Sequence, residues 1–179
     1  MRGYLKLAVL LFCWLLLCNA RWSEKKAKNW YAKYTWSAGF NYAPSYAVNE
    51  IEMWESFDET VVDRELKWAH DIGFSKLRVF LHVGPYQAHA QQFFEKIDKF
   101  VLIAKKYDHH MIPLLFDDCW KPQYQMGSQP DPIPGVHNSQ WVQCPGETQI
   151  DEIVLRNYVT DVISHFKNED TVVMWDLYN

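Results

Sequence analysis

The sequence is poor in the features that mark nucleic-acid-binding and membrane-spanning proteins. Its 18 Lys and Arg residues against 22 Asp and Glu give a formal net charge of −4, and no basic stripe is present to neutralise phosphates. We therefore expect no nucleic acid among the partners. The apolar run near the N-terminus covers only residues 7–17. A membrane-spanning helix needs roughly 20 apolar residues, so we expect no stable insertion into a membrane.

Phosphate-binding and metal-binding patterns are also missing. The 7 glycines never form Gly-x-Gly-x-x-Gly, which removes the usual reason for an open nucleotide-binding sheet. Adjacent His109 and His110 lack the helical or tetrahedral spacing of metal ligands, and a solvated turn before a strand is the better interpretation. The sequence therefore implies no metal and no organic cofactor.

Residues 1–20 are typical of a secretory signal peptide. Arg2 and Lys6 precede the apolar run, and Cys18, Asn19 and Ala20 form an exit of small residues. We expect a secreted or periplasmic protein whose remaining part covers residues 21–179. Lipoprotein anchoring at Cys18 is a second possibility, which the bulky Leu17 disfavours.

Only two of the four cysteines, Cys119 and Cys144, lie outside this segment. In an exported protein they could form a disulfide, although spacing in the sequence does not establish the geometry. Two separate buried thiols are the alternative, because free cysteine behaves as a small apolar side chain.

Apolar periodicity predicts alternating strands and helices after a first helix capped by Ser23. That helix carries Ala27, Trp30, Tyr31 and Tyr34 on one face, which we expect to pack inward. The expected order then runs strand 39–42, helix 59–72, strand 76–81, helix 91–107, strand 111–116, a proline-rich loop 117–147, helix 150–166 and strand 171–178. The inward positions of the three later helices are Val62, Leu66 and Ala69; Phe93, Ile97, Phe100, Val101 and Ala104; Leu155, Tyr158, Val159, Val162 and Phe166.

This order predicts an α/β fold with parallel strands, because each helix must cross over to bring the next strand beside the last. The strand centres Phe40, Val79, Leu115 and Met174 are 39 (79 − 40), 36 (115 − 79) and 59 (174 − 115) residues apart. The extra length of the last interval lies in a loop that leaves the C-terminal end of a strand. A TIM barrel carries its site on that face, so we expect the first half of a (β/α)8 barrel with four parallel strands, three crossover helices and one N-terminal helix.

Polar and aromatic side chains gather where the expected strands end. They are Asn41, Tyr42, Arg78, His82, Asp117, Asp118, Trp120, Asp176, Tyr178 and Asn179, with His137, Asn138 and Trp141 in the loop. Glycosidic bond cleavage needs two carboxyl groups across the bond, and aromatic rings provide flat platforms for sugars. Structural roles are the alternatives: a buried ion pair for Arg78, turns for Asp117 and Asp118, and loop packing for Trp120 and Trp141. Core or interface packing is the simplest role for Trp22, Trp30, Trp54 and Trp68.

The closing residues Val-Val-Met-Trp-Asp-Leu-Tyr-Asn (172–179) resemble the fourth strand of the retaining glycosidase clan that includes glycoside hydrolase family 5. Further segments are similar to secreted bacterial cellulase-family or β-1,4-xylanase-like hydrolases. They are residues 22–31, 39–45, 52–54, 77–82, 115–120 and 134–143. In the clan this strand ends in an asparagine that is followed directly by the acid/base glutamate.

The resemblance implies a retaining hydrolase of β-1,4-linked glycans of the xylan, glucan or mannan type, of which this chain is an N-terminal fragment. Asn179 matches the asparagine that binds the sugar 2-hydroxyl, and Arg78 the arginine that orients the nucleophile. The acid/base would follow Asn179 and the nucleophile would lie on a seventh strand, so neither is expected within the chain. Many clan members have a histidine where Asp117 and Asp118 stand. A non-catalytic carbohydrate-binding protein and an unrelated TIM-barrel enzyme are the alternatives.

Overall fold

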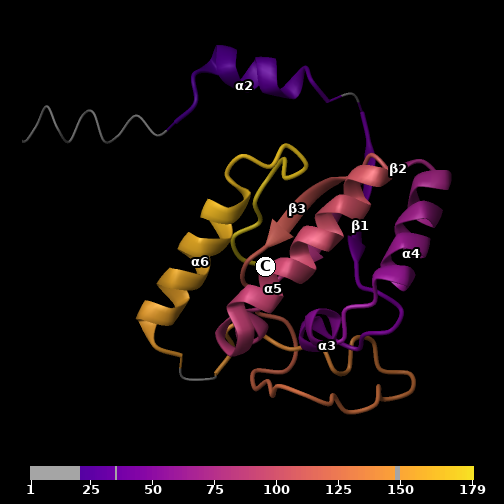
Figure 1. Cartoon of the computed structure of the whole chain (residues 1–179), viewed down its shortest axis with the longest axis vertical. Coiled ribbons are helices and arrows are strands. Elements are labelled where there is room, and N and C mark those ends of the chain that lie inside the picture. Colours follow the sequence, from indigo (N-terminus) through magenta and orange to yellow (C-terminus); the bar gives the residue numbers. More distant parts are fainter. Residues whose placement is uncertain (1–20, 35, 148–149) are drawn as a thin grey trace, which may run out of the picture. The chain divides into compact units, whose positions relative to one another are not determined.

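The computed structural model describes residues 21–34, 36–147 and 150–179, and the chain divides into two units between Ser37 and Ala38 (Figure 1). The segment expected to be a signal peptide, residues 1–20 with Cys18, lies outside the described residues. Within the described part, no helix is long and apolar enough to cross a membrane.

The first unit contains helix α2 (Glu24–Tyr31), whose predicted cap is confirmed. Ser23 accepts a hydrogen bond from the backbone N of Lys26. The Trp30 ring lies 6.1 Å from that of Trp22 and 5.0 Å from that of Tyr34. No residue of α2 is buried, so the expected inward packing of its aromatic face is not found within this unit.

The second unit is built on a parallel sheet in the order β1 (Ala38–Tyr42), β2 (Phe74–Phe80) and β3 (His110–Leu114). Asn41 of β1 lies opposite Arg78 of β2, which lies opposite Ile112 of β3. Helices α4 (Glu59–Asp71), α5 (Val83–Lys106) and α6 (Glu152–Phe166) lie side by side along the sheet (Figure 1). The α/β class and the parallel pairing are confirmed.

The expected fourth strand is not formed, and the count of four strands is wrong for this structure. The end of the chain runs beside β3 but is joined to it only by isolated parallel bridges, Met111 with Val172 and Leu114 with Asp176. The interval between the bridges is three residues on β3 and four on the partner, so one residue bulges out. Pro113 lies between the bridges on β3, and proline has no N–H to donate to a neighbouring strand.

Two helical segments appear where none was predicted. Helix α3 (Glu50–Glu55) interrupts the loop after β1, and Asn49 caps it by accepting from the backbone N of Glu52. Helix α5 begins at Val83 instead of residue 91, and a non-helical residue at His89 marks a kink inside it. The ends of α4 and α6 agree with their predicted ranges to within two residues.

Side chains alternate between two faces of the sheet, as the strand period requires. Leu77 and Val79 are buried in the core beneath the helices, where the predicted inward residues of α4, α5 and α6 also pack. On the opposite face, Phe80 forms a smaller cluster with Leu114 and Trp141. The helix side of the sheet is therefore its core, and the other side is available for a site.

Three single-residue predictions are decided by this packing. Trp54 is fully buried as expected, and its Nε1 donates to the Phe80 carbonyl over 2.7 Å. Trp68 is 58% exposed on α4, so it does not belong to the core, and the alternative of interface packing stays a prediction. His109 is buried beside α4 with Nε2 2.9 Å from Leu66 O, so the expected solvated turn is also wrong at that residue.

Candidate functional site

A cavity of about 400 Å³ opens where the three strands end, on the face away from the helices. It is lined by Asn41, Ala43, Arg78, Phe80, Asp117, Cys119, Trp120, His137, Asn138, Trp141 and Asn179. The set comes from β1, β2, the chain after β3, the loop 117–147 and the last described residue. Parallel strands bring these segments together because their C-terminal ends meet at one edge.

Of the thirteen polar and aromatic residues expected at the strand ends and in the loop, all but Tyr42, Asp176 and Tyr178 are predicted to bind substrate, and eight of these ten line this cavity. They are Asn41, Arg78, Asp117, Trp120, His137, Asn138, Trp141 and Asn179. His82 and Asp118 lie elsewhere. Five of the eight follow from the positions of the strand ends, and His137, Asn138 and Trp141 from the proline-rich loop.

Arg78 reaches from β2 to the end of the chain. Its Nε donates to Asp176 Oδ2 over 2.8 Å, and its terminal nitrogen lies 2.6 Å from the same oxygen and 2.8 Å from Asn179 Oδ1. The partly buried ion pair and the place in the cavity wall coexist, so the two alternatives considered for Arg78 are compatible. The guanidinium holds the side chain of Asn179 in a fixed orientation, because it can donate to two acceptors at once.

Asp117 is the only carboxylate among the described residues that line the cavity, and it is 2% exposed. Its Oδ1 accepts from Asn179 Nδ2 over 3.0 Å, and its Oδ2 accepts from Trp141 Nε1 over 2.8 Å. Backbone bonds with Cys144 in both directions fix the main chain of Asp117. Arg78, Asn179, Asp117 and Trp141 therefore form one continuous hydrogen-bonded wall, which we call the polar wall.

The two loop tryptophans differ in what they can offer a ligand. Trp141 is 8% exposed, and its ring packs edge-on against Phe80 with centroids 4.9 Å apart. Trp120 is 59% exposed, lies 6.4 Å from the His137 ring, and has a positive φ of 62°. A non-glycine residue held in this left-handed region marks a strained position. Trp120 is therefore the ring with an open face, while Trp141 belongs to the packed wall.

His82 is a buried capping residue and is absent from the described lining of the cavity. Its Nδ1 accepts from the backbone N of Gly84 at the start of α5, and its Nε2 donates to the Gln143 carbonyl, each over 2.9 Å. Burial lowers the pKa of His82 to about 4, so the ring is neutral at physiological pH. The prediction that His82 contacts substrate is not matched by this position.

Asp118 faces a second hollow of about 620 Å³, on the other side of Trp120. The hydroxyl of Tyr178 is hydrogen-bonded to the Asp118 carboxylate, which raises the pKa of Tyr178. The backbone N of Asp118 also donates to the carbonyl of Asn179 over 3.2 Å. Asp118 therefore links the loop to the end of the chain outside the main cavity.

Cys119 and Cys144 are free thiols, so the disulfide considered from the sequence is not formed. The Cys119 sulfur lies in the cavity wall, 3.3 Å from Asn179 Nδ2. The Cys144 sulfur lies in the helix-side core, 3.5 Å from Leu115 O, and burial raises its pKa to about 12. Because the two side chains lie in separate clusters, a bond between them would require the loop to move.

Glu50 is a buried acid behind the cavity that the sequence analysis missed. It begins α3, is fully buried, and receives a 3.4 Å contact from the backbone N of Val142 at Oε2. Burial raises the pKa of Glu50 well above its ordinary value, and the nearby Asp117 raises it further. The Asn49-x-x-Glu52 capping pattern is the signal that would have revealed α3, and with it the burial of Glu50.

Within the described part of the chain, no three His, Cys, Asp or Glu side chains are arranged to hold a metal ion. The cavity instead offers the Asp117 carboxylate, which accepts two hydrogen bonds, and the Arg78 guanidinium. It also offers the side-chain amides of Asn41 and Asn138 and the open indole face of Trp120. Such a wall is suited to a neutral ligand that carries several hydroxyls and an apolar face.

Comparison with models of known protein families gives no match, and neither does comparison with curated protein sequences. Among solved structures, the chain is similar to the exo-β-1,4-mannosidase Op5Man5 from Opitutaceae bacterium strain TAV5. The match has a TM-score of 0.57 and 18% sequence identity, and it covers 83% of this chain and 26% of that chain. At this identity the likeness concerns the fold. It shows an arrangement of parallel strands and helices that is compatible with part of a TIM barrel.

Proposed function

We propose that this chain supplies the sugar-binding wall of a retaining glycoside hydrolase that acts on β-1,4-linked glycans. The observation that carries the proposal is the polar wall. In it, Arg78 donates to Asn179, Asn179 donates to Asp117, and the open ring of Trp120 lies beside them. Sugars need this combination, because hydroxyls require directed donors and acceptors while the ring face packs on an indole.

Asn179 holds the central place in the proposed site. Its Oδ1 accepts from Arg78 and its Nδ2 donates to Asp117, so its amide orientation is determined. A fixed amide is suited to bind a sugar hydroxyl beside the scissile bond. Both Asp117 oxygens already accept hydrogen bonds, one from a buried indole. We therefore assign Asp117 to holding the wall, and not to proton transfer or attack.

Retaining hydrolysis requires an acid/base and a nucleophile about 5–5.5 Å apart. We propose that the acid/base is the residue that follows Asn179 and that the nucleophile is carried by a later strand. Arg78 would then help to orient that nucleophile in addition to Asp176. The similarity to an exo-β-1,4-mannosidase makes β-1,4-mannosides the first substrates to test, followed by xylan and glucan oligosaccharides.

A non-catalytic carbohydrate-binding protein is the second candidate. The observation in its favour is that the polar wall and Trp120 are assembled without a free carboxylate among the described residues that line the cavity. Such a protein would bind the same oligosaccharides without cleaving them.

We also propose that residues 1–20 direct export and that a carbohydrate is the partner. Sequencing of the N-terminus of the exported protein would test the first of these two proposals.

One experiment separates the candidates. The coding sequence after Asn179 is read, the encoded protein is expressed, and reducing-sugar release is measured with β-1,4-mannan, xylan and glucan oligosaccharides. Hydrolysis that is lost in Asn179→Ala and kept in the exposed control Asn168→Ala supports the hydrolase. Binding without release supports the second candidate. Absence of both binding and release from every β-1,4-glycan overturns the proposal.

A further inference from the structure

Glu50 has surroundings that do not suit a charged carboxylate. The side chain is fully buried, and its Oε1 has no hydrogen-bond partner in the described part of the chain. Its Oε2 receives the 3.4 Å contact from Val142 N, and the backbone N–H of Glu50 itself and the Trp141 side chain are further hydrogen-bond partners of the carboxyl group. Asp117, Cys119 and Cys144 interact with it electrostatically, and none of these three groups is a cation.

These surroundings favour the uncharged form of Glu50. An ionised carboxylate buried without strong donors is costly, and a second negative charge nearby adds repulsion. Asp117 accepts two well-formed hydrogen bonds, from Trp141 Nε1 and Asn179 Nδ2, whereas the contact from Val142 N to Glu50 is 3.4 Å long and Oε1 of Glu50 has no partner among the described residues. The uncharged, protonated form is therefore the favoured form of Glu50.

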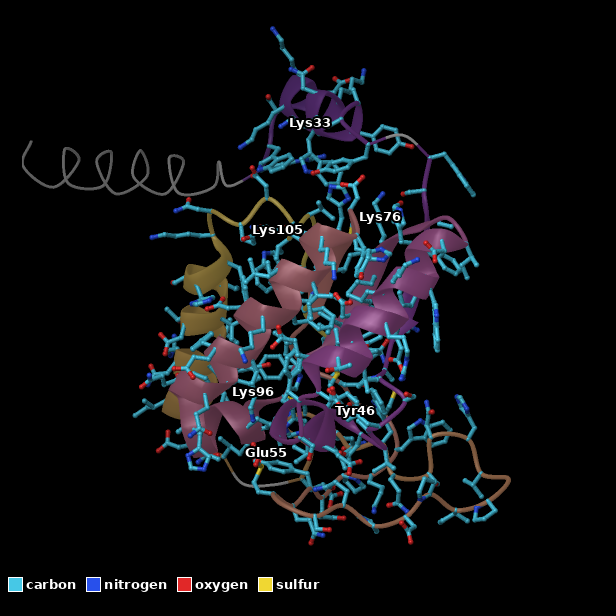
Figure 2. The ribbon with its side chains drawn as sticks, turned by 45° about the vertical axis from the view of Figure 1, so that its right-hand side comes forward. Lys33, Tyr46, Glu55, Lys76, Lys96 and Lys105 are labelled. Carbon is cyan, nitrogen blue, oxygen red and sulfur yellow. The ribbon has the colours of Figure 1, made fainter. Side chains whose placement is uncertain are left out.

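Helix α3 presents Glu50 to the loop in a fixed position. Asn49 Nδ2, just before Glu50, donates to Gln140 O over 3.1 Å. The far end of α3 is held by Lys96 of α5, whose Nζ donates to Glu55 O over 3.0 Å (Figure 2). The hydroxyl of Tyr46 donates to Met53 O over 3.0 Å. Both ends of the short helix are therefore anchored, and the backbone from which the Glu50 side chain extends is held in place.

We propose that Glu50 is a positioning residue for this cavity. As an uncharged carboxylic acid it supports Trp141 and Val142, and through the Trp141 indole it fixes the Asp117 carboxylate that holds Asn179. The inference rests on the proposed function, because it names the group that regulates the same sugar-binding wall. Ionised Glu50 would compete with Asp117 for the indole N–H and repel its carboxylate. The wall would then loosen, and sugar affinity would fall as the pH rises.

The variants Glu50→Gln and Glu50→Ala test this assignment. Glutamine has the shape of the protonated acid and never ionises, so it should keep the wild-type affinity to within about two-fold at acid pH and remove the alkaline loss. Alanine removes the support and should weaken binding by roughly ten-fold at every pH. Glu152→Gln is the matched control, because Glu152 forms an exposed ion pair with Arg156 on α6. Its affinity should follow that of the wild type at every pH. Affinity for a β-1,4-mannooligosaccharide is measured by tryptophan fluorescence across the pH range.

A second measurement needs no sugar. The near-ultraviolet circular dichroism of the tryptophans is titrated with alkali in wild type, Glu50→Gln and Trp141→Phe. The transition assigned to Glu50 should be present in the wild type and missing from both variants. A transition that persists in Glu50→Gln overturns the inference, as does equal weakening of binding by glutamine and alanine at acid pH. Loss of the transition in a protein that binds no sugar would keep the positioning role and overturn the proposed function instead.

Discussion

The indole Nε1 of Trp141 donates a 2.8 Å hydrogen bond to Oδ2 of the buried Asp117. This bond joins the far end of the loop 117–147 to the residue that begins it, across 24 positions of sequence. It also leaves Oδ1 of Asp117 free to accept from Asn179. This buried contact therefore connects the loop, which the backbone bonds between Asp117 and Cys144 also close, to the orientation of the cavity wall.

Trp141→Phe should destabilise the protein and weaken sugar binding. Phenylalanine keeps most of the packing on Phe80 but removes a donor to a buried carboxylate, a loss of about 2 kcal/mol. Urea unfolding followed by circular dichroism measures the effect. Trp68→Phe removes an exposed indole on α4 and should change the free energy of unfolding little. Equal effects of the two substitutions would contradict the role given to Trp141.

Arg78→Lys should reduce sugar affinity by about ten-fold although the positive charge is kept. Lysine is a compact point charge, so it cannot reproduce the fork that reaches Asp176 and Asn179 together. Isothermal titration with a β-1,4-mannooligosaccharide measures the loss. Arg156→Lys is the matched control, because Arg156 pairs with Glu152 at the surface and such pairs contribute little. Wild-type affinity in Arg78→Lys would show that charge alone is sufficient.

The fold could be predicted wherever burial repeats with a clear period. The stripe on α5 from Phe93 to Ala104 is fully buried because only one face of that helix meets the sheet. Helix α3 has six residues, too few for an apolar period to be counted. The fourth strand was expected from the apolar run 171–178. Its neighbour β3 contains Pro113, which has no backbone N–H to donate to that run, and the residues of the run alone do not reveal this.

The site could be predicted only as far as position along a strand determines it. Arg78 and Asn179 were identified because strand ends converge on one edge. Whether a loop side chain faces the cavity depends on contacts distant in sequence, so Trp120 and Trp141 could not be distinguished. Glu50 shows the same limit, because its burial results from the loop residue Val142, 92 positions away.

His82 and Glu50 should give opposite pH dependences to stability. Burial lowers the folded-state pKa of His82 from its ordinary value of 6.5 to about 4. Between these two pH values the unfolded chain binds a proton at His82 that the folded chain does not bind. Its contribution is present above pH 6.5 and is lost as the pH falls toward 4, a change on the order of 3 kcal/mol. Burial raises the folded-state pKa of Glu50. The contribution of Glu50 to the free energy of unfolding is complete below its ordinary pKa of 4.5, and it is lost as the pH rises through the raised pKa.

Single variants separate these two effects. His82→Asn keeps a capping acceptor at the start of α5 but cannot titrate, so its stability deficit relative to wild type should shrink as the pH falls from 6.5 toward 4. Glu50→Gln should have a stability that falls less than that of the wild type above pH 4.5. His89→Asn, an exposed site on α5, is the control. Parallel curves for wild type and His82→Asn would contradict the assignment of His82.

The two cysteines of the loop should be recovered as thiols with very different reactivities. Burial raises the pKa of Cys144 to about 12, and burial also raises the pKa of the partly exposed Cys119. A maleimide should label Cys119 slowly in the folded protein and Cys144 only after denaturation, because the thiolate is the reactive form. Peptide mass mapping without reductant assigns each site. A disulfide-linked peptide that contains both residues would show that the loop adopts a different arrangement.

Trp120→Ala should abolish the fluorescence change on sugar binding and reduce affinity by about ten-fold, through loss of a stacking face. The exposed ring borders both hollows of the site, and its strained backbone is kept although it costs stability.

Trp120→Gly provides an independent readout, because glycine accepts a positive φ without strain. It should bind as weakly as alanine but unfold at a higher urea concentration. Trp36→Ala, which removes an exposed indole outside both hollows, should leave affinity unchanged. Full affinity in Trp120→Ala would exclude the ring from the sugar site. Higher stability of Trp120→Gly than of Trp120→Ala would still show that the backbone at this position is strained, whether or not the ring binds sugar.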